Sequence, residues 1–212
     1  VYKRQGKIVG EVYHKGLESI AERNFRPHVS CTRTTPDGNF VMAADLGIDQ
    51  VKIYSFNDKG EKLNLVDMIP CKINSAPRFF EFSGDGKYLY LMYEMENVVD
   101  VFSYEAKPGD RSLKIEKIQT VSSTGGPLNH EPESKFDHRM TAATASSFAS
   151  NFKYMFVSNA GDNAVCLFER DEDTGLLKER LCLPISGEYP KDVAVFPNNK
   201  HIASLRLTIK RD

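Results

Sequence analysis

The sequence predicts an all-β protein whose strands form the repeated sheets of a β-propeller, and three observations support that prediction. Residues 40–54, 88–102 and 154–168 repeat one order of apolar and turn residues. No long stretch keeps the apolar spacing of an amphipathic helix. Each repeat has room for four short strands in about 45 residues, which is typical of a propeller blade.

Each repeat has the same order of elements. An inner strand comes first, at 29–35, 78–82, 144–148 and 192–196. A turn follows, with pairs such as Asp37-Gly38 and Asp85-Gly86, because Asp and Gly fit tight turns. The repeated block supplies the second and third strands, and a polar turn leads to an outer strand at 63–69, 113–121 and 177–185. Blade-like units are therefore expected at about 25–70, 76–123, 141–186 and 190–212.

A four-stranded sheet that is apolar on both faces needs another sheet on each side, and radial closure provides one. A β-sandwich is the alternative, but sandwich strands do not repeat this order with matching turns. Propellers typically have about 4–8 complete blades. We therefore expect this chain, with its three and a half blades, to be part of a longer ring. Residues 7–16 are expected to be the outer strand of an earlier blade, and 124–140 an insertion loop.

Composition argues against several classes of partner. Lys and Arg number 28 against 29 Asp and Glu, so the net charge is −1. This balance lacks the basic surface that nucleic acid or an anionic membrane attracts, and no apolar run is long enough to cross a bilayer. We expect no nucleic-acid or membrane partner and leave the oligomeric state open.

The sequence also lacks the motifs of common cofactor sites. No P-loop or GxGxxG occurs, and no cofactor is expected. His130 and His138, with their acidic neighbours, are expected to form a solvated charged loop, so no metal is expected.

The four cysteines are far apart and show no C-x-x-C spacing: Cys31, Cys71, Cys166 and Cys182. A zinc site is therefore not expected, and a chain of this size needs no disulfide framework. No secretory leader is visible, and we expect reduced thiols in a cytoplasmic protein. Cys31 and Cys166 are expected to be small core residues rather than nucleophiles.

The geometry of a propeller brings polar residues from several repeats together. The inner strands line the central channel, and the turn between the second and third strands opens at the same end as the start of the inner strand. Sites are commonly built at such positions on a rigid scaffold. The inner strands contribute His28, Ser30, Arg78, Thr144 and Lys191; the second strands and their turns contribute Asp45, Asp49, Glu94 and Asn159.

Six stretches resemble the seven-bladed lactonase family typified by bacterial 6-phosphogluconolactonase of the propeller type. They are residues 44–51, 76–78, 84–90, 157–161, 173–176 and 187–192, in the family's order. The resemblance implies hydrolysis of a sugar lactone, most directly 6-phosphogluconolactone to 6-phosphogluconate, without a cofactor. The sequence departs from the family pattern at Phe79, Ala145 and Ala160, where the family tends to have His, Glu and Arg, and Lys191 stands where the family has Arg.

The implied chemistry suggests a role for each candidate residue. His28 is the expected general base, because an imidazole titrates near neutral pH. Glu94 or Asp45 orients it or serves as the base instead. Arg78 suits a phosphate, because its guanidinium forms two parallel hydrogen bonds to an oxyanion. The expected substrate-binding residues are Arg78, Lys191 and Asn159.

Structural interpretations remain beside these roles. Arg78 and Lys191 also suit salt bridges between blades, His28 a solvated loop, and Asp45 and Asp49 a bond to their own turn backbone. At the level of function, one alternative is a propeller that binds a ligand or a protein without catalysis. Another is a related cyclase or isomerase that forms a lactone.

Overall fold

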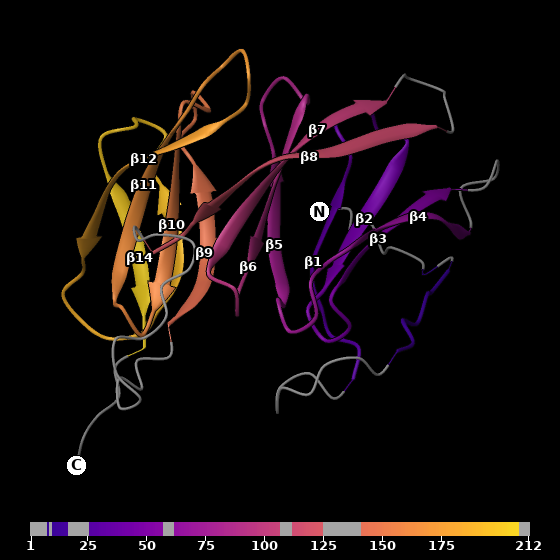
Figure 1. Cartoon of the computed structure of the whole chain (residues 1–212), viewed down its shortest axis with the longest axis horizontal. Coiled ribbons are helices and arrows are strands. Elements are labelled where there is room, and N and C mark those ends of the chain that lie inside the picture. The colour runs from indigo at the N-terminus through magenta and orange to yellow at the C-terminus, as the bar shows by residue number, and fades with distance from the viewer. Residues whose placement is uncertain are drawn as a thin grey trace, which may run out of the picture.

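The computed structural model describes residues 8, 10–16, 26–56, 62–106, 112–124 and 141–207. These ranges contain strands and no helix, which confirms the all-β prediction. Three sheets have four antiparallel strands each, and a fourth sheet has two. We name them blades A to D in chain order. Figure 1 shows them side by side, from indigo and purple for blade A to yellow for blade D, which is the arrangement of propeller blades.

The strands follow one another within each blade, from the inner edge outwards. Blade A contains β1 (Val29–Thr34), β2 (Phe40–Asp45), β3 (Gln50–Phe56) and β4 (Leu63–Pro70). Blade B contains β5 (Pro77–Phe82), β6 (Tyr88–Tyr93), β7 (Val98–Ala106) and β8 (Leu113–Ser122). Blade C contains β9 (Ala142–Phe148), β10 (Tyr154–Ala160), β11 (Ala164–Arg170) and β12 (Leu177–Pro184). Blade D contains β13 (Pro190–Val195) and β14 (Ile202–Arg206).

Blade B shows how the sheets are held together. Successive side chains of a strand point to opposite faces, and β6 is apolar at every position. Leu89 and Leu91 pack into the core between blades A and B, whereas Tyr90 and Met92 pack into the core between blades B and C. All four are completely buried. The central blade is therefore covered on both faces, as radial packing requires.

Each inner strand begins with a β-bulge. In blade A the register passes from Val29 opposite Asp45 to Cys31 opposite Ala44, which leaves Ser30 as the extra residue. The same irregularity leaves one extra residue in each of the other blades: Arg78, Thr144 and Lys191. A bulge re-aims the extra side chain out of the regular alternation. Four repeats thus present one side chain each at the same end of the inner strands.

A second repeated feature joins each blade to the next. Asp49, Asn97 and Asn163 occupy the turn between the second and third strands of blades A, B and C, with φ angles of 50°, 53° and 53°. Asx residues tolerate this left-handed conformation better than other residues with a Cβ. Asp49 accepts hydrogen bonds from Asn74 N (2.7 Å) and Ala76 N (2.8 Å). Asn97 donates to Thr141 O (3.1 Å), and Asn163 accepts from Tyr189 N (2.8 Å). Each turn residue therefore fixes the chain that enters the following blade.

The prediction that all four thiols are reduced is wrong for one pair. Cys166 on β11 lies directly opposite Cys182 on β12 in the sheet register, and the two form a disulfide. Cys31 and Cys71 are free. The pairing follows from the strand register of blade C, which no cysteine spacing in the sequence reveals. Cys166 is nevertheless fully buried in the core between blades B and C, as expected of a core residue.

Two expectations concern segments near the edges of the described structure. Residues 10–16 form no strand, and the assignment of 7–16 to an earlier blade stays a prediction. The insertion at 125–140 lies outside the described residues.

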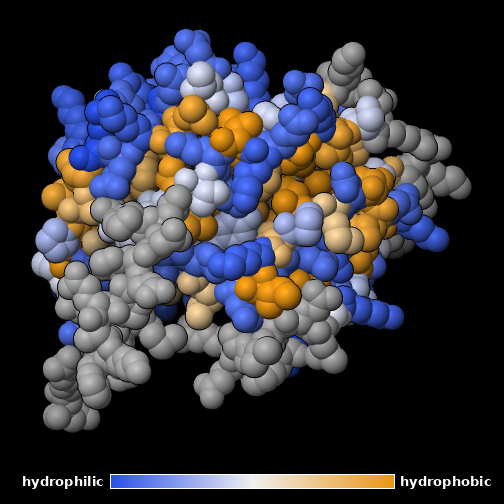
Figure 2. Space-filling model, in the orientation of Figure 1, coloured by the Kyte–Doolittle hydropathy of each residue, from blue (hydrophilic) through white to orange (hydrophobic). Residues whose placement is uncertain are grey.

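Among the residues that are described, no helix has the length and apolarity needed to cross a bilayer. Figure 2 shows apolar groups among the hydrophilic ones on one face, and exposed apolar side chains include Leu183 (56%) and Leu205 (65%).

We expect Asp49→Ala to destabilise the fold by roughly 2–4 kcal/mol. The substitution removes two hydrogen bonds to a buried carboxylate and leaves a residue with a Cβ at positive φ without Asx compensation. Asp49→Asn, which keeps one carbonyl oxygen, is the control and is expected to lose less. Chemical denaturation of the two variants and the parent measures both differences. Equal stability of Asp49→Ala and the parent would show that the contact does not hold the blades.

Candidate active site at the start of the inner strands

The bulge residues form a chain of hydrogen bonds from blade to blade. Ser30 Oγ donates to Pro77 O of blade B (3.2 Å). Arg78 Nε donates to Thr144 O of blade C (2.8 Å). Thr144 Oγ1 donates to Pro190 O of blade D (2.8 Å), next to Lys191. The structure therefore places these four side chains along one arc at the end of the inner strands, as the sequence predicts.

Arg78 and Glu94 form the charged centre of this arc. Arg78 Nη1 lies 2.6 Å from Glu94 Oε2, and the side chains are 32% and 10% exposed. Glu94 is itself placed by its backbone, because Glu94 N donates to Ala76 O (2.9 Å) at the entry to β5. The ion pair and the bond to Thr144 O hold the guanidinium in one orientation, while about a third of the Arg78 side chain stays accessible. This is a fixed cation at a solvent-accessible position.

Asp45 lies beneath the arc rather than on it. Its carboxylate is completely buried. Oδ1 accepts hydrogen bonds from His28 N (2.7 Å) and Gly47 N (3.0 Å). Oδ2 lies 2.6 Å from His14 Nδ1. Asp45 thus anchors the backbone of His28, and the expected contact between Asp45 and the imidazole ring of His28 does not appear. The His28 residue is exposed.

Asn159 and Lys191 are placed very differently. Asn159 is completely buried, and its amide pairs with Ser123: Nδ2 donates to Ser123 O (2.7 Å) and Oδ1 accepts from Ser123 Oγ (2.9 Å). This fixes the chain leaving β8. Lys191 is exposed on the bulge of β13. Of the six candidate residues, the structure brings Arg78 and Glu94 into contact, leaves His28 and Lys191 accessible, and buries Asp45 and Asn159.

The structure adds an ion pair that the sequence analysis missed. Arg33 on β1 reaches β5, where its Nε donates to Phe80 O (2.9 Å) and its Nη2 lies 3.6 Å from Glu81 Oε1. Burial raises the pKa of Glu81 to about 7, although the Arg33 guanidinium lowers it in part. Each of the two residues follows the bulge residue of its own strand by three positions. Charged side chains of opposite sign at the same repeat position of two neighbouring inner strands could therefore have indicated this ion pair from the sequence.

The described residues hold no group of three or more His, Cys, Asp or Glu side chains able to bind a metal ion. His130 and His138 lie in the segment outside the described residues. At this end of the inner strands the chemical resources are one fixed guanidinium, the largely buried carboxylate paired with it, hydroxyl groups, an exposed ammonium and an exposed imidazole. Such a set suits recognition of an oxyanion together with proton transfer.

The chain belongs to the family described as lactonase, 7-bladed beta-propeller, whose model matches residues 2–206. An uncharacterized protein of Staphylococcus saprophyticus is 28% identical over 196 residues, which are 92% of this chain and 52% of the relative. An uncharacterized protein of Staphylococcus aureus is 25% identical over 186 residues, 88% of this chain and 49% of the relative. The chain thus spans about half the length of the curated relatives that it matches.

Solved structures give the same fold. A Pseudomonas aeruginosa periplasmic gluconolactonase has a TM-score of 0.76 at 24% identity, over 90% of this chain and 50% of that one. A Bacteroides fragilis protein described as a "putative 6-phosphogluconolactonase" has a TM-score of 0.74 at 27% identity, over 92% and 52%. A protein from Lactobacillus plantarum has a TM-score of 0.76 at 23% identity, over 92% and 52%. The predicted propeller fold and the family resemblance are confirmed.

The raised pKa of Glu81 predicts a pH-dependent stability difference between the parent and Glu81→Gln. Well below pH 4.5, the ordinary pKa of a glutamate, the carboxyl is protonated in both the folded and the unfolded chain. As the pH rises from about 4.5 to about 7, the unfolded chain loses the proton while the folded chain still keeps it, and the parent loses up to roughly 2–3 kcal/mol from this group. Glu81→Gln lacks this loss. Denaturant midpoints of both proteins across this pH range measure it, and a difference that does not change with pH would contradict the raised pKa.

Proposed function

We propose that the protein containing this chain hydrolyses a sugar lactone, most readily 6-phosphogluconolactone, to the open acid. The observation that carries the proposal is Arg78, a cation that Glu94 and Thr144 O hold in place at the accessible end of the inner strands. Membership of the lactonase family supports the reaction class. The B. fragilis neighbour, named for a phosphorylated substrate, supports the choice of lactone.

Each candidate residue has a distinct role in this proposal. Arg78 binds the phosphate of the substrate, and Lys191 adds a second positive charge from blade D. His28 takes a proton from the attacking water, since its backbone is anchored by Asp45 and the residue is exposed to solvent. Glu94 is the second candidate base, although its Oε2 is occupied by Arg78. The burial of Asp45 and Asn159 favours positioning roles for both.

A propeller that binds a ligand without catalysis is the second candidate function. It is favoured by the small side chains at Ala145 and Ala160, where the family tends to carry charged groups, and by the internal pairing of Arg78 with Glu94. A role in carbohydrate metabolism is proposed only together with the lactonase activity.

The cytoplasmic location stays a prediction, and the Cys166–Cys182 disulfide weighs against it, because disulfides persist mainly in oxidising compartments.

Two variants of the native protein separate phosphate binding from chemistry. Arg78→Ala removes a charge-assisted contact worth roughly 1.5–3 kcal/mol, so kcat/KM for the phosphorylated lactone is expected to fall about 10- to 150-fold. The unphosphorylated lactone is expected to lose much less. His28→Ala removes the base and is expected to slow both substrates by a similar factor, on the order of 100- to 10,000-fold. Lactone-opening rates, corrected for spontaneous hydrolysis, give these values.

Two controls accompany these variants: the melting temperature of each variant, and a conservative replacement of Arg78. Both variants must melt like the parent, and Arg78→Lys, which keeps the positive charge, is expected to recover part of the loss. Equal losses on the two substrates in Arg78→Ala would rule out the phosphate role. A fully active His28→Ala would move the base to Glu94. If the parent opens no lactone faster than buffer does, the binding function is the better conclusion.

A further inference from the structure

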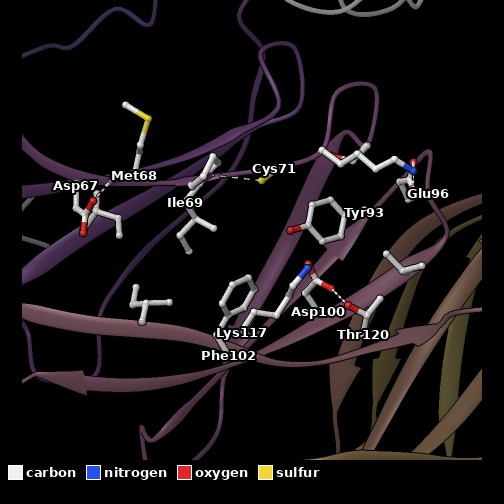
Figure 3. Close-up of a pocket in the computed structure, with 16 residues that line it drawn as sticks. Asp67, Met68, Ile69, Cys71, Tyr93, Glu96, Asp100, Phe102, Lys117 and Thr120 are labelled. Atoms are coloured by element: carbon white, nitrogen blue, oxygen red, sulfur yellow. Dashed lines mark hydrogen bonds and ion pairs between the residues drawn. The ribbon is translucent and has the colours of Figure 1, made fainter.

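A cavity of about 520 Å³ lies between blades A and B, on the side of their outer strands. It is bordered by β3 and β4 of blade A and by β7 and β8 of blade B, and none of the bulge residues lines it. Figure 3 shows the hydroxyl of Tyr93 and the carboxylate of Asp100 beside Phe102 and Ile69, with Cys71 above them. The cavity is therefore separate from the candidate active site.

We call the line of contact between the outer strands of two neighbouring blades a seam. The cavity exists because the seam between blades A and B is open, whereas the seam between blades B and C is closed. Between blades B and C, Gln119 closes the seam: its Nε2 donates to Leu177 O (2.9 Å) and its Oε1 accepts from Leu177 N (2.8 Å). The strand registers place Asp67 of blade A at the position of Gln119, opposite Ile53 as Gln119 is opposite Val101. A carboxylate accepts hydrogen bonds but donates none, so Asp67 cannot make the same pair of bonds. Asp67 instead accepts from its neighbour Met68 N (2.8 Å).

The wall of the cavity is apolar and its inner end is polar. Ile53, Ile69, Phe102 and Ile115 form the apolar wall. At the polar end, Asp100 is 94% buried, since its exposed fraction is 6%. Its Oδ1 accepts from Thr120 Oγ1 (2.5 Å), and its Oδ2 lies 3.5 Å from Lys117 Nζ. A buried carboxylate of this kind is an anchor for a cationic or hydrogen-bond-donating group.

An unsatisfied hydroxyl lines the same cavity. Ser75 is buried, with 1% of its surface exposed, and its Oγ makes no hydrogen bond to any residue that the structure describes. Leaving such a group without a partner costs free energy, and native proteins rarely do so. A ligand with a polar head would supply the missing partner.

The charges on the lining favour a cation. Asp67, Asp100 and Glu96 carry three negative charges, against two positive charges on Lys72 and Lys117. Glu96 is already paired with Lys72 at 2.8 Å. Burial raises the pKa of the Cys71 thiol to about 12, and burial also raises the pKa of Tyr93, so both groups stay neutral near pH 7. The lining therefore has one negative charge in excess.

We infer that this cavity binds a small amphipathic amine: one ammonium group held by the buried carboxylate of Asp100, and an aromatic or branched aliphatic body held by the wall of Ile53, Ile69 and Phe102. The ammonium donates to the Asp100 carboxylate and to Ser75 Oγ, and the ring of Phe102 contributes a surface that attracts cations. This inference does not depend on the proposed lactonase activity.

Three probes of equal size test the inference on the native protein that contains this chain. Phenethylamine, 2-phenylethanol and phenylacetate carry a positive, a neutral and a negative head on similar bodies. Calorimetry and ligand-observed NMR are expected to show the amine binding at least about 10-fold more tightly than the alcohol, a difference equal to one charge-assisted bond, and no binding of the acid. Equal binding of amine and acid, or no binding of the amine, would overturn the inference.

Two variants locate the binding. Asp67→Gln is expected to restore the bonds of the closed seam, to raise the melting temperature and to abolish binding of the amine. Leu181→Gln is the matched control, because Leu181 occupies the same register position in blade C and is 40% exposed. It is expected to leave binding unchanged. Asp100→Asn is expected to weaken the amine but not the alcohol. Parent-like amine binding in a folded Asp67→Gln would place the site elsewhere and contradict the inference.

Discussion

The central blade B has two apolar faces, and it can bury both only between two other sheets. The strand β6 shows this constraint in one segment, because its alternate side chains enter two different cores. A hydrophobic driving force of this kind is not directional. It requires that neighbouring blades cover one another, and the direction in which they are stacked follows from the connections between them. Those connections are held by the Asx residues at positive φ, which tie each turn to the chain entering the next blade.

Stacking the blades side by side brings the starts of the inner strands to one end of the molecule. A bulge at each start then decides which side chain is presented there. Without the extra residue, Arg78 would follow the alternation of β5 and enter a core between sheets. With it, Arg78 spans from its own blade to the backbone of blade C while part of its side chain faces solvent. The candidate site is therefore a product of one inserted residue per repeat, used four times with different side chains.

The same repetition makes the differences between seams informative. Gln119 closes the seam between blades B and C with two hydrogen bonds, and its counterpart Asp67 leaves the preceding seam open. In the open seam, Asp100, Thr120 and Lys117 form a polar cluster in the lining of the cavity. The cavity is recognised by this difference between the two seams.

The sequence alone determined the order of strands and turns, because both depend on local patterns: apolar runs of strand length, Asp-Gly turns, and the same order in three successive copies. It also determined that Arg78 and Glu94 lie near each other, since a propeller brings those positions to one end. Only the tertiary structure decided how the polar residues are used. The carboxylate of Asp45 anchors a backbone, and the amide of Asn159 fixes a connection, because burial leaves each to satisfy nearby main-chain groups. Cys166 pairs with Cys182, and Arg33 meets Glu81, because strand register and blade packing place them side by side. Such contacts depend on distances between separate strands, which residue order along the chain does not contain.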